Sequence, residues 1–93
     1  MTVRVLRSRR AAAEIHEIAA YLDEYSPAAA ERFLEALERA YRQLSEFPNS
    51  GVPGTRPDTR RLVVGNYIVS HRRHGADVEV FAVRHARRRD ARL

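Results

Sequence analysis

Apolar residues recur at helical spacing in two consecutive stretches of the chain, residues 8–25 and 27–47. Steps of three and four residues gather them on one face of each predicted helix, whereas the acidic residues of the first stretch, Glu14 included, take its opposite face. The predicted core positions are Ala11, Ile15, Ile18, Ala19, Leu22, Ala30, Phe33, Leu37, Tyr41 and Leu44. Ser8 and Ser26 are the predicted N-caps, because a serine hydroxyl accepts hydrogen bonds from the first free amides of a helix. Two amphipathic helices joined so closely fold back as a hairpin.

Shorter runs rich in apolar residues, before and after the hairpin, predict strands. One covers residues 2–7, and three others, RRLVVG, NYIVSHRR and DVEVFAVRH, follow the loop-like stretch 48–59 with its prolines and glycines. Gly65-Asn66 suits a two-residue turn, and residues 74–77 suit a longer one. We therefore expect a single domain over residues 1–93 with an α+β fold of order β-α-α-β-β-β. The helical hairpin should pack on one face of a mainly antiparallel sheet, because its apolar stripes have no other partner.

The second face of this sheet is expected to stay partly open and to be apolar. Simple alternation along the last strand places Val78, Val80 and Ala82 on one face and Phe81 and Val83 on the other. In the strand before it, Tyr67 and Val69 oppose Ile68 by the same rule. An uncovered aliphatic face is a liability unless a second chain covers it. Val69 and Phe81 are therefore predicted to contact a partner.

Charge is distributed unevenly along the chain. All 17 basic residues are arginine, and the formal net charge is +5. Residues 49–93 hold 10 arginines against 4 acidic residues, so this half carries the positive charge and should attract an acidic partner. Guanidinium groups favour bidentate contacts with carboxylate or phosphate. The absence of cysteine excludes disulfides and fits a cytoplasmic protein, and no apolar run is long enough to span a membrane.

The residues show no pattern typical of a metal site or of a common catalytic motif. The four histidines are His16, His71, His74 and His85. His71 and His74 would point to opposite faces of a strand, and no cysteine or paired carboxylate accompanies them. Neither a phosphate-binding glycine loop nor a strained serine elbow occurs. We expect no metal and no cofactor.

A group of arginines around one histidine remains as the candidate site. Arg61, Arg72 and Arg84 belong to three neighbouring predicted strands and can meet in one patch. A charged residue inside an apolar strand, such as Arg84, is expected to be paired or functional. The arginines after the last strand can equally serve to keep a sheet edge from pairing, and a histidine in this place can bond backbone or act near neutral pH. The candidate binding residues are Arg61, Arg72, Arg84, His85, Arg87, Arg88, Val69 and Phe81.

Three long segments together resemble the ParE branch of the ParE/RelE toxin superfamily of bacterial toxin–antitoxin systems. They are EIHEIAAYLDEYSPAAAERFLEALERAYRQLSEFPNSG, RRLVVGNYIVSHRR and VEVFAVRHARRRD. The resemblance covers nearly the whole chain and implies a toxin that a co-encoded antitoxin holds inactive. It further implies that RelE-like members cut messenger RNA on the ribosome without metal, using basic residues and often a tyrosine near the C-terminus. This chain has no lysine and no tyrosine after Tyr67, which favours the ParE branch and its implied target, DNA gyrase.

Three hypotheses follow and stay open at this point. The first is a ParE-like toxin that inhibits gyrase by binding, with no catalytic residue. The second is a RelE-like ribonuclease, with Arg61, Arg72 and Arg84 on phosphate and His85 as the acid or base. The third is a non-toxic remnant that still binds an antitoxin. The expected partner in each case is a ParD-like antitoxin with an acidic, amphipathic tail, and neither membrane association nor sequence-specific nucleic-acid binding is expected.

Overall fold

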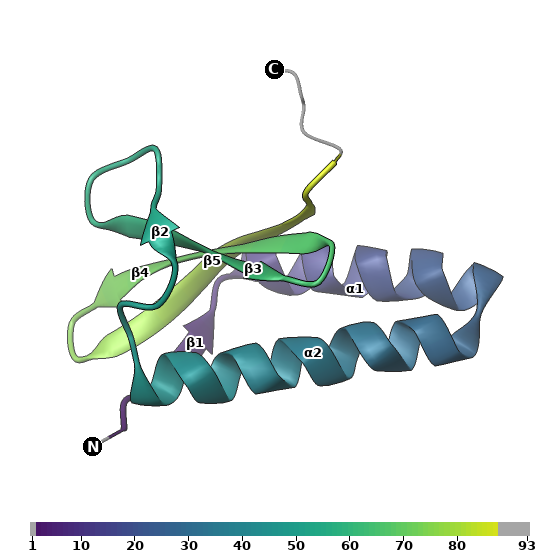
Figure 1. The fold of residues 1–93 in the computed structure, drawn as a ribbon, viewed down its shortest axis with the longest axis horizontal. Coiled ribbons are helices and arrows are strands. Elements are labelled where there is room, and N and C mark those ends of the chain that lie inside the picture. Colours follow the sequence, from purple (N-terminus) through teal and green to yellow (C-terminus); the bar gives the residue numbers. More distant parts are fainter. Residues whose placement is uncertain (1, 88–93) are drawn as a thin grey trace.

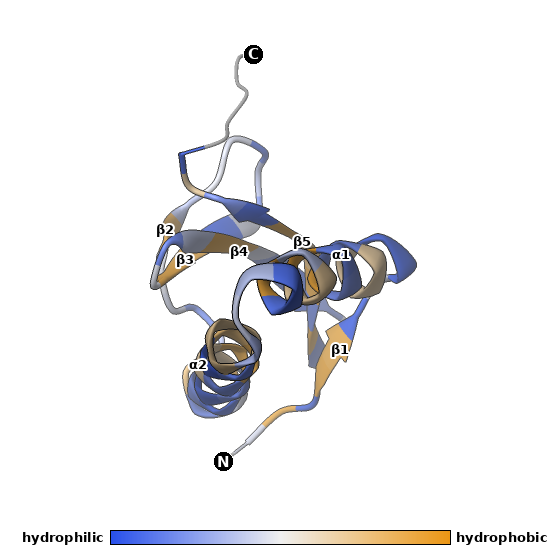
Figure 2. Cartoon of the chain, turned by 90° about the vertical axis from the view of Figure 1, so that its right-hand side faces the viewer, coloured by the Kyte–Doolittle hydropathy of each residue, from blue (hydrophilic) through white to orange (hydrophobic). Residues whose placement is uncertain are grey.

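The computed structural model describes residues 2–87 as a five-stranded sheet with two long helices on one of its faces (Figure 1). The elements in chain order are β1 (Val5–Arg7), α1 (Arg9–Tyr25), α2 (Pro27–Glu46), β2 (Val52–Pro53), β3 (Thr59–Val64), β4 (Tyr67–His74) and β5 (Asp77–His85). Seen end on, both helices lie on the same side of the sheet (Figure 2). The predicted α+β fold, with a helical hairpin on one face, is confirmed.

The strand order in the sheet is β1-β5-β4-β3-β2. The pairs β5–β4, β4–β3 and β3–β2 are antiparallel, and the edge strand β1 pairs with β5 in parallel. The turns at Gly65-Asn66 and Gly75-Ala76 join the antiparallel strands as the sequence predicts, and both glycines have positive φ.

The strand β2 lies inside the stretch that the sequence predicts as a loop. Val52 and Pro53 pair with Arg61 and Arg60 of β3. Gly51 permits this pairing: its φ is +95°, and a side chain there would collide with the Arg61 carbonyl. Proline cannot donate a ladder hydrogen bond, so β2 remains a short edge strand.

Both helices begin at the predicted serines. The Ala11 amide donates to Ser8 Oγ at 3.0 Å, and the Ala29 amide donates to Ser26 Oγ at 3.2 Å. Pro27 occupies the first turn of α2, where its missing N–H and fixed φ cost nothing. The helices therefore start where their first amides find a side-chain acceptor.

The core lies between the helices and the sheet. Its fully or nearly buried members are Ala11, Ile15, Phe33, Leu37, Leu44, Val69, Val78, Val80 and Val83. Phe33 packs against the Tyr67 ring with centroids 4.8 Å apart, which ties the middle of α2 to β4. Leu22 and Tyr41 are partly buried against the same cluster. The predicted helix faces are thus the faces that meet the sheet.

One residue of β5 is skipped in the pairing with β4, and this changes which side chains face the helices. Ser70 pairs with Ala82 and His71 pairs with Val80, so Phe81 has no partner and forms a bulge. A bulge adds one residue to one strand and shifts its alternation. Val83 therefore joins Val80 on the helix side, although simple alternation predicts it on the opposite face.

The bulge also changes which residues lie on the open face of the sheet. Val69 pairs with Val83 and is 0% exposed in the core, so the expectation that Val69 lies uncovered for a partner is wrong. Phe81 does border the open face, but it is partly buried there. Val78, Val80 and Val83 all turn toward the helices, so the aliphatic residues of the open face come from other strands: Val63 pairs with Ile68 there and is 67% exposed.

His71 is a buried polar residue that fastens a loop to the sheet. Its side chain is among the most buried of the protein, and its Nε2 lies 2.9 Å from the Ser50 carbonyl oxygen, to which it must donate. Arg60 Nη1 donates to the neighbouring Gly51 carbonyl at 3.2 Å. Burial lowers the pKa of His71, and the nearby Arg60 charge lowers it further, against the opposing effect of the Ser50 hydrogen bond. This histidine is structural.

Truncation of Phe33 should remove much of the stability. Phe33→Ala is expected to lower the free energy of unfolding by about 3–5 kcal/mol, because it leaves a cavity against Tyr67. Leu34→Ala is the matched control: it is the next residue of α2, and its side chain is 45% exposed. Urea unfolding followed by circular dichroism measures both, and equal losses for the two variants would contradict the assigned helix face.

Acid should weaken the fold through His71. Because its pKa is lowered in the folded state, the unfolded chain binds the proton more readily once the pH falls below about 6.5, the ordinary histidine value. The unfolding free energy is then expected to decrease, at most by about 1.4 kcal/mol per pH unit. His71→Gln keeps a donor for Ser50 and should flatten this decrease, whereas the exposed His74→Gln should not. An unchanged slope in His71→Gln would rule out this cause.

Candidate functional site

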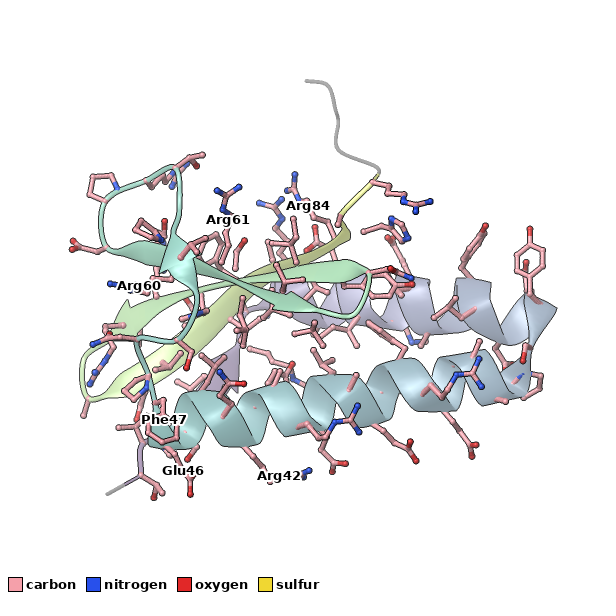
Figure 3. The ribbon with its side chains drawn as sticks, in the orientation of Figure 1. Arg42, Glu46, Phe47, Arg60, Arg61 and Arg84 are labelled. Atoms are coloured by element: carbon pink, nitrogen blue, oxygen red, sulfur yellow. The ribbon has the colours of Figure 1, made fainter. Side chains whose placement is uncertain are left out.

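Two unpaired arginines stand on the face of the sheet that the helices leave open. Arg61 of β3 pairs with Ser70 of β4, and Arg84 of β5 pairs with Ile68. Paired residues share a face, so the two guanidinium groups lie on the same side, and both point away from the helices (Figure 3). Both are exposed, and neither forms an ion pair or a side-chain hydrogen bond with any residue of the described part, 2–87.

Arg72 lies on the same face, but its charge is already compensated. Its guanidinium bonds Glu79, with Nη2 and Oε1 3.1 Å apart. The same group sits 5.0 Å from the centroid of the Phe81 ring and covers it. The structure thus brings the three predicted arginines of the sheet to one depression of about 600 Å³. Only Arg61 and Arg84 of these three offer an unpaired charge.

The His85 side chain lies on the other face of the sheet from the arginines with which the sequence groups it. It follows Arg84 directly in an extended strand, so its ring turns the other way and stands edge-on to Tyr67 with centroids 5.1 Å apart. The Arg87 amide donates to its Nδ1 at 3.1 Å. The ring borders the depression only from the end of β5. Arg87 is exposed, and Arg88 lies outside the described residues.

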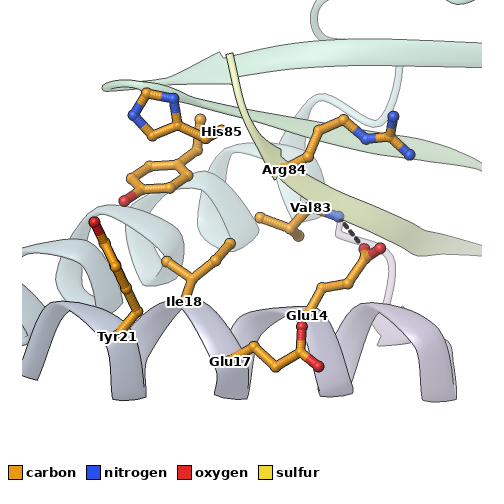
Figure 4. Close-up of a pocket in the computed structure, with 8 residues that line it drawn as sticks. Glu14, Glu17, Ile18, Tyr21, Val83, Arg84 and His85 are labelled. Atoms are coloured by element: carbon orange, nitrogen blue, oxygen red, sulfur yellow. Dashed lines mark hydrogen bonds between the residues drawn. The ribbon is translucent and has the colours of Figure 1, made fainter. Parts of the chain in front are cut away.

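A groove between α1 and the free edge of β5 was not foreseen from the sequence. It measures about 550 Å³ and is lined by Glu14, Glu17, Ile18, Tyr21, Tyr67, Val83, Arg84 and His85 (Figure 4). Tyr21 is 54% exposed and meets the more exposed Tyr25 edge to face, with centroids 5.0 Å apart. Exposed aromatic side chains beside a groove are typical of protein interfaces.

Glu14 closes part of the β5 edge and does not point into solvent as its predicted helix face suggests. Val83 N–H donates to Glu14 Oε1 at 2.8 Å, and Arg10 Nε donates to Glu14 Oε2 at 3.1 Å. The cause is the shortness of β1, which pairs only with Val78 to Val80 of β5. Beyond that point the Val83 amide has no neighbouring strand, and the carboxylate of α1 takes the place of one.

The chemistry that the open depression supports is the binding of anions. Its lining contains several arginines and hydroxyls, and among the described residues that line it there is no carboxylate and no tyrosine. No group of three histidine, aspartate or glutamate residues within 2–87 is arranged to hold a metal ion. No helix of the described part is both long and apolar enough to cross a membrane.

Comparison with known proteins places these features in a family. A family model described as the ParE toxin of the type II toxin–antitoxin system parDE matches residues 5–90. A relative named Putative toxin Y4kP, from Sinorhizobium fredii, is 38% identical over 85 residues, which cover 89% of this chain and 88% of the relative. Toxin RelE2 from Caulobacter vibrioides is 32% identical over 79 residues, covering 85% and 90%.

Among solved structures, the chromosomal ParDE toxin–antitoxin system from P. aeruginosa contains a chain with the same fold. The TM-score is 0.76 at 18% identity, and the match covers 90% of this chain and 96% of that chain. The similarity supports the fold of two helices on one face of a mainly antiparallel sheet.

Loss of the Glu14 carboxylate should cost stability at the β5 edge. Glu14→Ala is expected to lower the unfolding free energy by about 1–3 kcal/mol, because the Val83 amide loses its acceptor. Glu14→Gln should recover most of this loss, since its amide oxygen can still accept. Glu17 lies one turn along α1, and its side chain has no hydrogen bond to another residue of the described part of the chain, so Glu17→Ala should stay within about 0.5 kcal/mol of the parent. Thermal and urea unfolding measure the stability of the three variants. A loss for Glu14→Ala as small as that for Glu17→Ala would contradict this role of Glu14 and would show that water replaces the carboxylate.

Proposed function

Because the chain belongs to the ParE toxin family of type II toxin–antitoxin systems, we propose that it inhibits DNA gyrase by binding, and that a co-encoded acidic antitoxin neutralises it. The observation that carries the binding mechanism is the pair of uncompensated arginines, Arg61 and Arg84, on an open sheet face. In this proposal the protein acts in the cytoplasm, where it meets gyrase.

The surroundings of the arginines support binding over catalysis. Cleavage of RNA through its 2′-hydroxyl needs a base, an acid and stabilisation of the developing charge. The open depression supplies the charge stabilisation, but its described lining holds one imidazole, that of His85, and no carboxylate or tyrosine to act as a second acid or base. The His85 ring faces Tyr67, and its Nδ1 already accepts the Arg87 amide. A surface that attracts an anionic partner without transforming it fits these contacts.

The proposed antitoxin matches two features of the surface. Its acidic residues would pair with the basic second half of the chain, where the exposed Arg84 lines the groove and Arg87 is also exposed. Its apolar residues would have anchors in the same groove, at Ile18 and the exposed Tyr21. The similar chain from P. aeruginosa belongs to a ParDE system, which supports an antitoxin partner for this family.

A RelE-like ribonuclease is the second candidate function. The relative from Caulobacter vibrioides is named Toxin RelE2, and that likeness favours this branch. In this case Arg61 and Arg84 would hold phosphate groups, and His85 at the strand end would act as the acid or base. A remnant that binds the antitoxin and inhibits nothing is the third candidate.

Two assays on the purified protein separate these functions. A binding toxin should inhibit gyrase supercoiling, and Arg61→Ala and Arg84→Ala should each weaken inhibition in a graded manner. His85→Ala should change it little, and Arg42→Ala on the outer side of α2 should serve as a charge-matched control (Figure 3). A ribonuclease should instead cut messenger RNA on translating ribosomes, and His85→Ala should slow cleavage by a factor of roughly 10²–10⁴.

The outcome that would overturn the leading proposal is ribosome-dependent cleavage of messenger RNA with gyrase unaffected. Expression in cells without the antitoxin gives the same decision: a DNA damage response supports gyrase inhibition, and translation arrest supports the ribonuclease. Inactivity in every assay would leave the remnant.

A further inference from the structure

We propose that the open face of the sheet binds the phosphodiester backbone of duplex DNA. The inference rests on the proposed function, because a gyrase inhibitor meets its target on DNA and this selects DNA over RNA as the source of the phosphates. In this assignment Arg61 and Arg84 contact phosphate groups of the DNA, and Arg56 is a third arginine that does so. Binding of this kind is independent of base sequence, since no element of the face is shaped to enter a groove and read base edges.

Free cations and free hydroxyls meet in the open depression. Arg56, from the loop before β3, lines it together with Arg61 and Arg84, and no ion pair within residues 2–87 includes any of the three. The hydroxyl groups of Thr55 and Ser70 border the same space. Arginine guanidinium and serine or threonine hydroxyl groups are among the side-chain groups that contact phosphate in protein–DNA complexes. The lining holds no carboxylate among the described residues that would repel a phosphate.

The same depression lacks what a peptide partner would need. The large apolar side chains that are well exposed are Tyr21, Tyr25, Leu34, Phe47, Val52 and Val63, and none of them lines it. Phe81 does line it, but the Arg72 guanidinium covers its ring. Tryptophan and tyrosine anchors carry much of the binding energy of protein interfaces, whereas interfaces with nucleic acid are more polar and much more positively charged. Val52 and Val63 do lie on the open face, because they pair with Arg61 and Ile68, but they stand outside the depression. A phosphate backbone therefore fits the depression better than a peptide does.

The placement of the arginines allows more than one phosphate to be held at once. Arg61 lies on β3 and Arg84 on β5, with Ser70 and Ile68 of β4 between them. Two strand spacings separate the backbones by roughly 10 Å. The two long side chains can thus reach different phosphates of one duplex.

The salt dependence of DNA binding tests this assignment. Fluorescence anisotropy with a short labelled duplex of arbitrary sequence, between about 50 and 200 mM salt, should give a log–log slope of about −2 to −3. That slope corresponds to two or three phosphate contacts at about 0.9 each. The double variant Arg61→Ala/Arg84→Ala should make the slope less negative by about 1.8, since two contacts are lost. Thermal unfolding of each variant checks that the fold is kept.

The matched control removes the same charge from the opposite side of the molecule. Arg39 and Arg42 are exposed on α2, and Arg42 lies on the side of α2 away from the sheet (Figure 3). Arg39→Ala/Arg42→Ala should leave the slope unchanged. Equal effects of the two double variants would overturn the assignment, because binding would then reflect net charge alone. Binding to duplex RNA more than about tenfold tighter than to DNA would also overturn it and would favour the ribonuclease.

Failure of this inference is distinguishable from failure of the proposed function. A protein that inhibits gyrase but binds DNA without dependence on Arg61 and Arg84 refutes the inference and leaves the gyrase proposal standing. A protein that binds DNA through these arginines but does not inhibit gyrase supports the inference and refutes the proposed target.

Discussion

The skipped residue in β5 decides which side chains meet the helices and which meet the solvent. With Phe81 left out of the pairing, Val80 and Val83 both enter the core, although they stand an odd number of residues apart. Each of these valines is essentially fully buried and contributes on the order of 1.5–3 kcal/mol through the hydrophobic effect. The same shift directs Arg84 to the open face and the His85 ring to Tyr67. Without the bulge, one face would have to accommodate both valine and arginine.

The shortness of β1 creates the second surface. Because β1 stops at Arg7, the residues of β5 beyond Val80 form an edge with no strand beside it. An unpaired amide next to the core is costly, and Glu14 of α1 supplies the missing acceptor for Val83. The carboxylate also holds α1 at a fixed place along β5, with the groove that contains Tyr21 beside it. The two surfaces therefore have separate causes: a bulge produces the arginine face, and a short strand produces the groove.

Much of the fold could be predicted from the sequence, because it depends on local signals. The serine caps, the proline at the start of α2 and the glycine turns each act within a few residues, and the structure has all of them. The convergence of Arg61, Arg72 and Arg84 followed from the meander, since neighbouring strands bring such residues together. The bulge could not be predicted, because register depends on pairing across strands and one extra residue leaves no mark on composition. For the same reason simple alternation puts Val69 on the wrong face. The Glu14 contact depends on where a distant strand ends. The target itself stays a prediction.

The central claim is that the open sheet face, and not the outer helix surface, meets the target. A photoreactive amino acid placed at one position on each surface tests it most directly. Val63, which pairs with Ile68 and is 67% exposed, represents the open face, and Leu34, 45% exposed on α2, represents the helix surface. Each is replaced by p-benzoylphenylalanine, and the protein is irradiated with gyrase bound to DNA. The account predicts cross-links from position 63, to gyrase or to DNA, and few from position 34. Cross-links from position 34 with none from position 63 would contradict it.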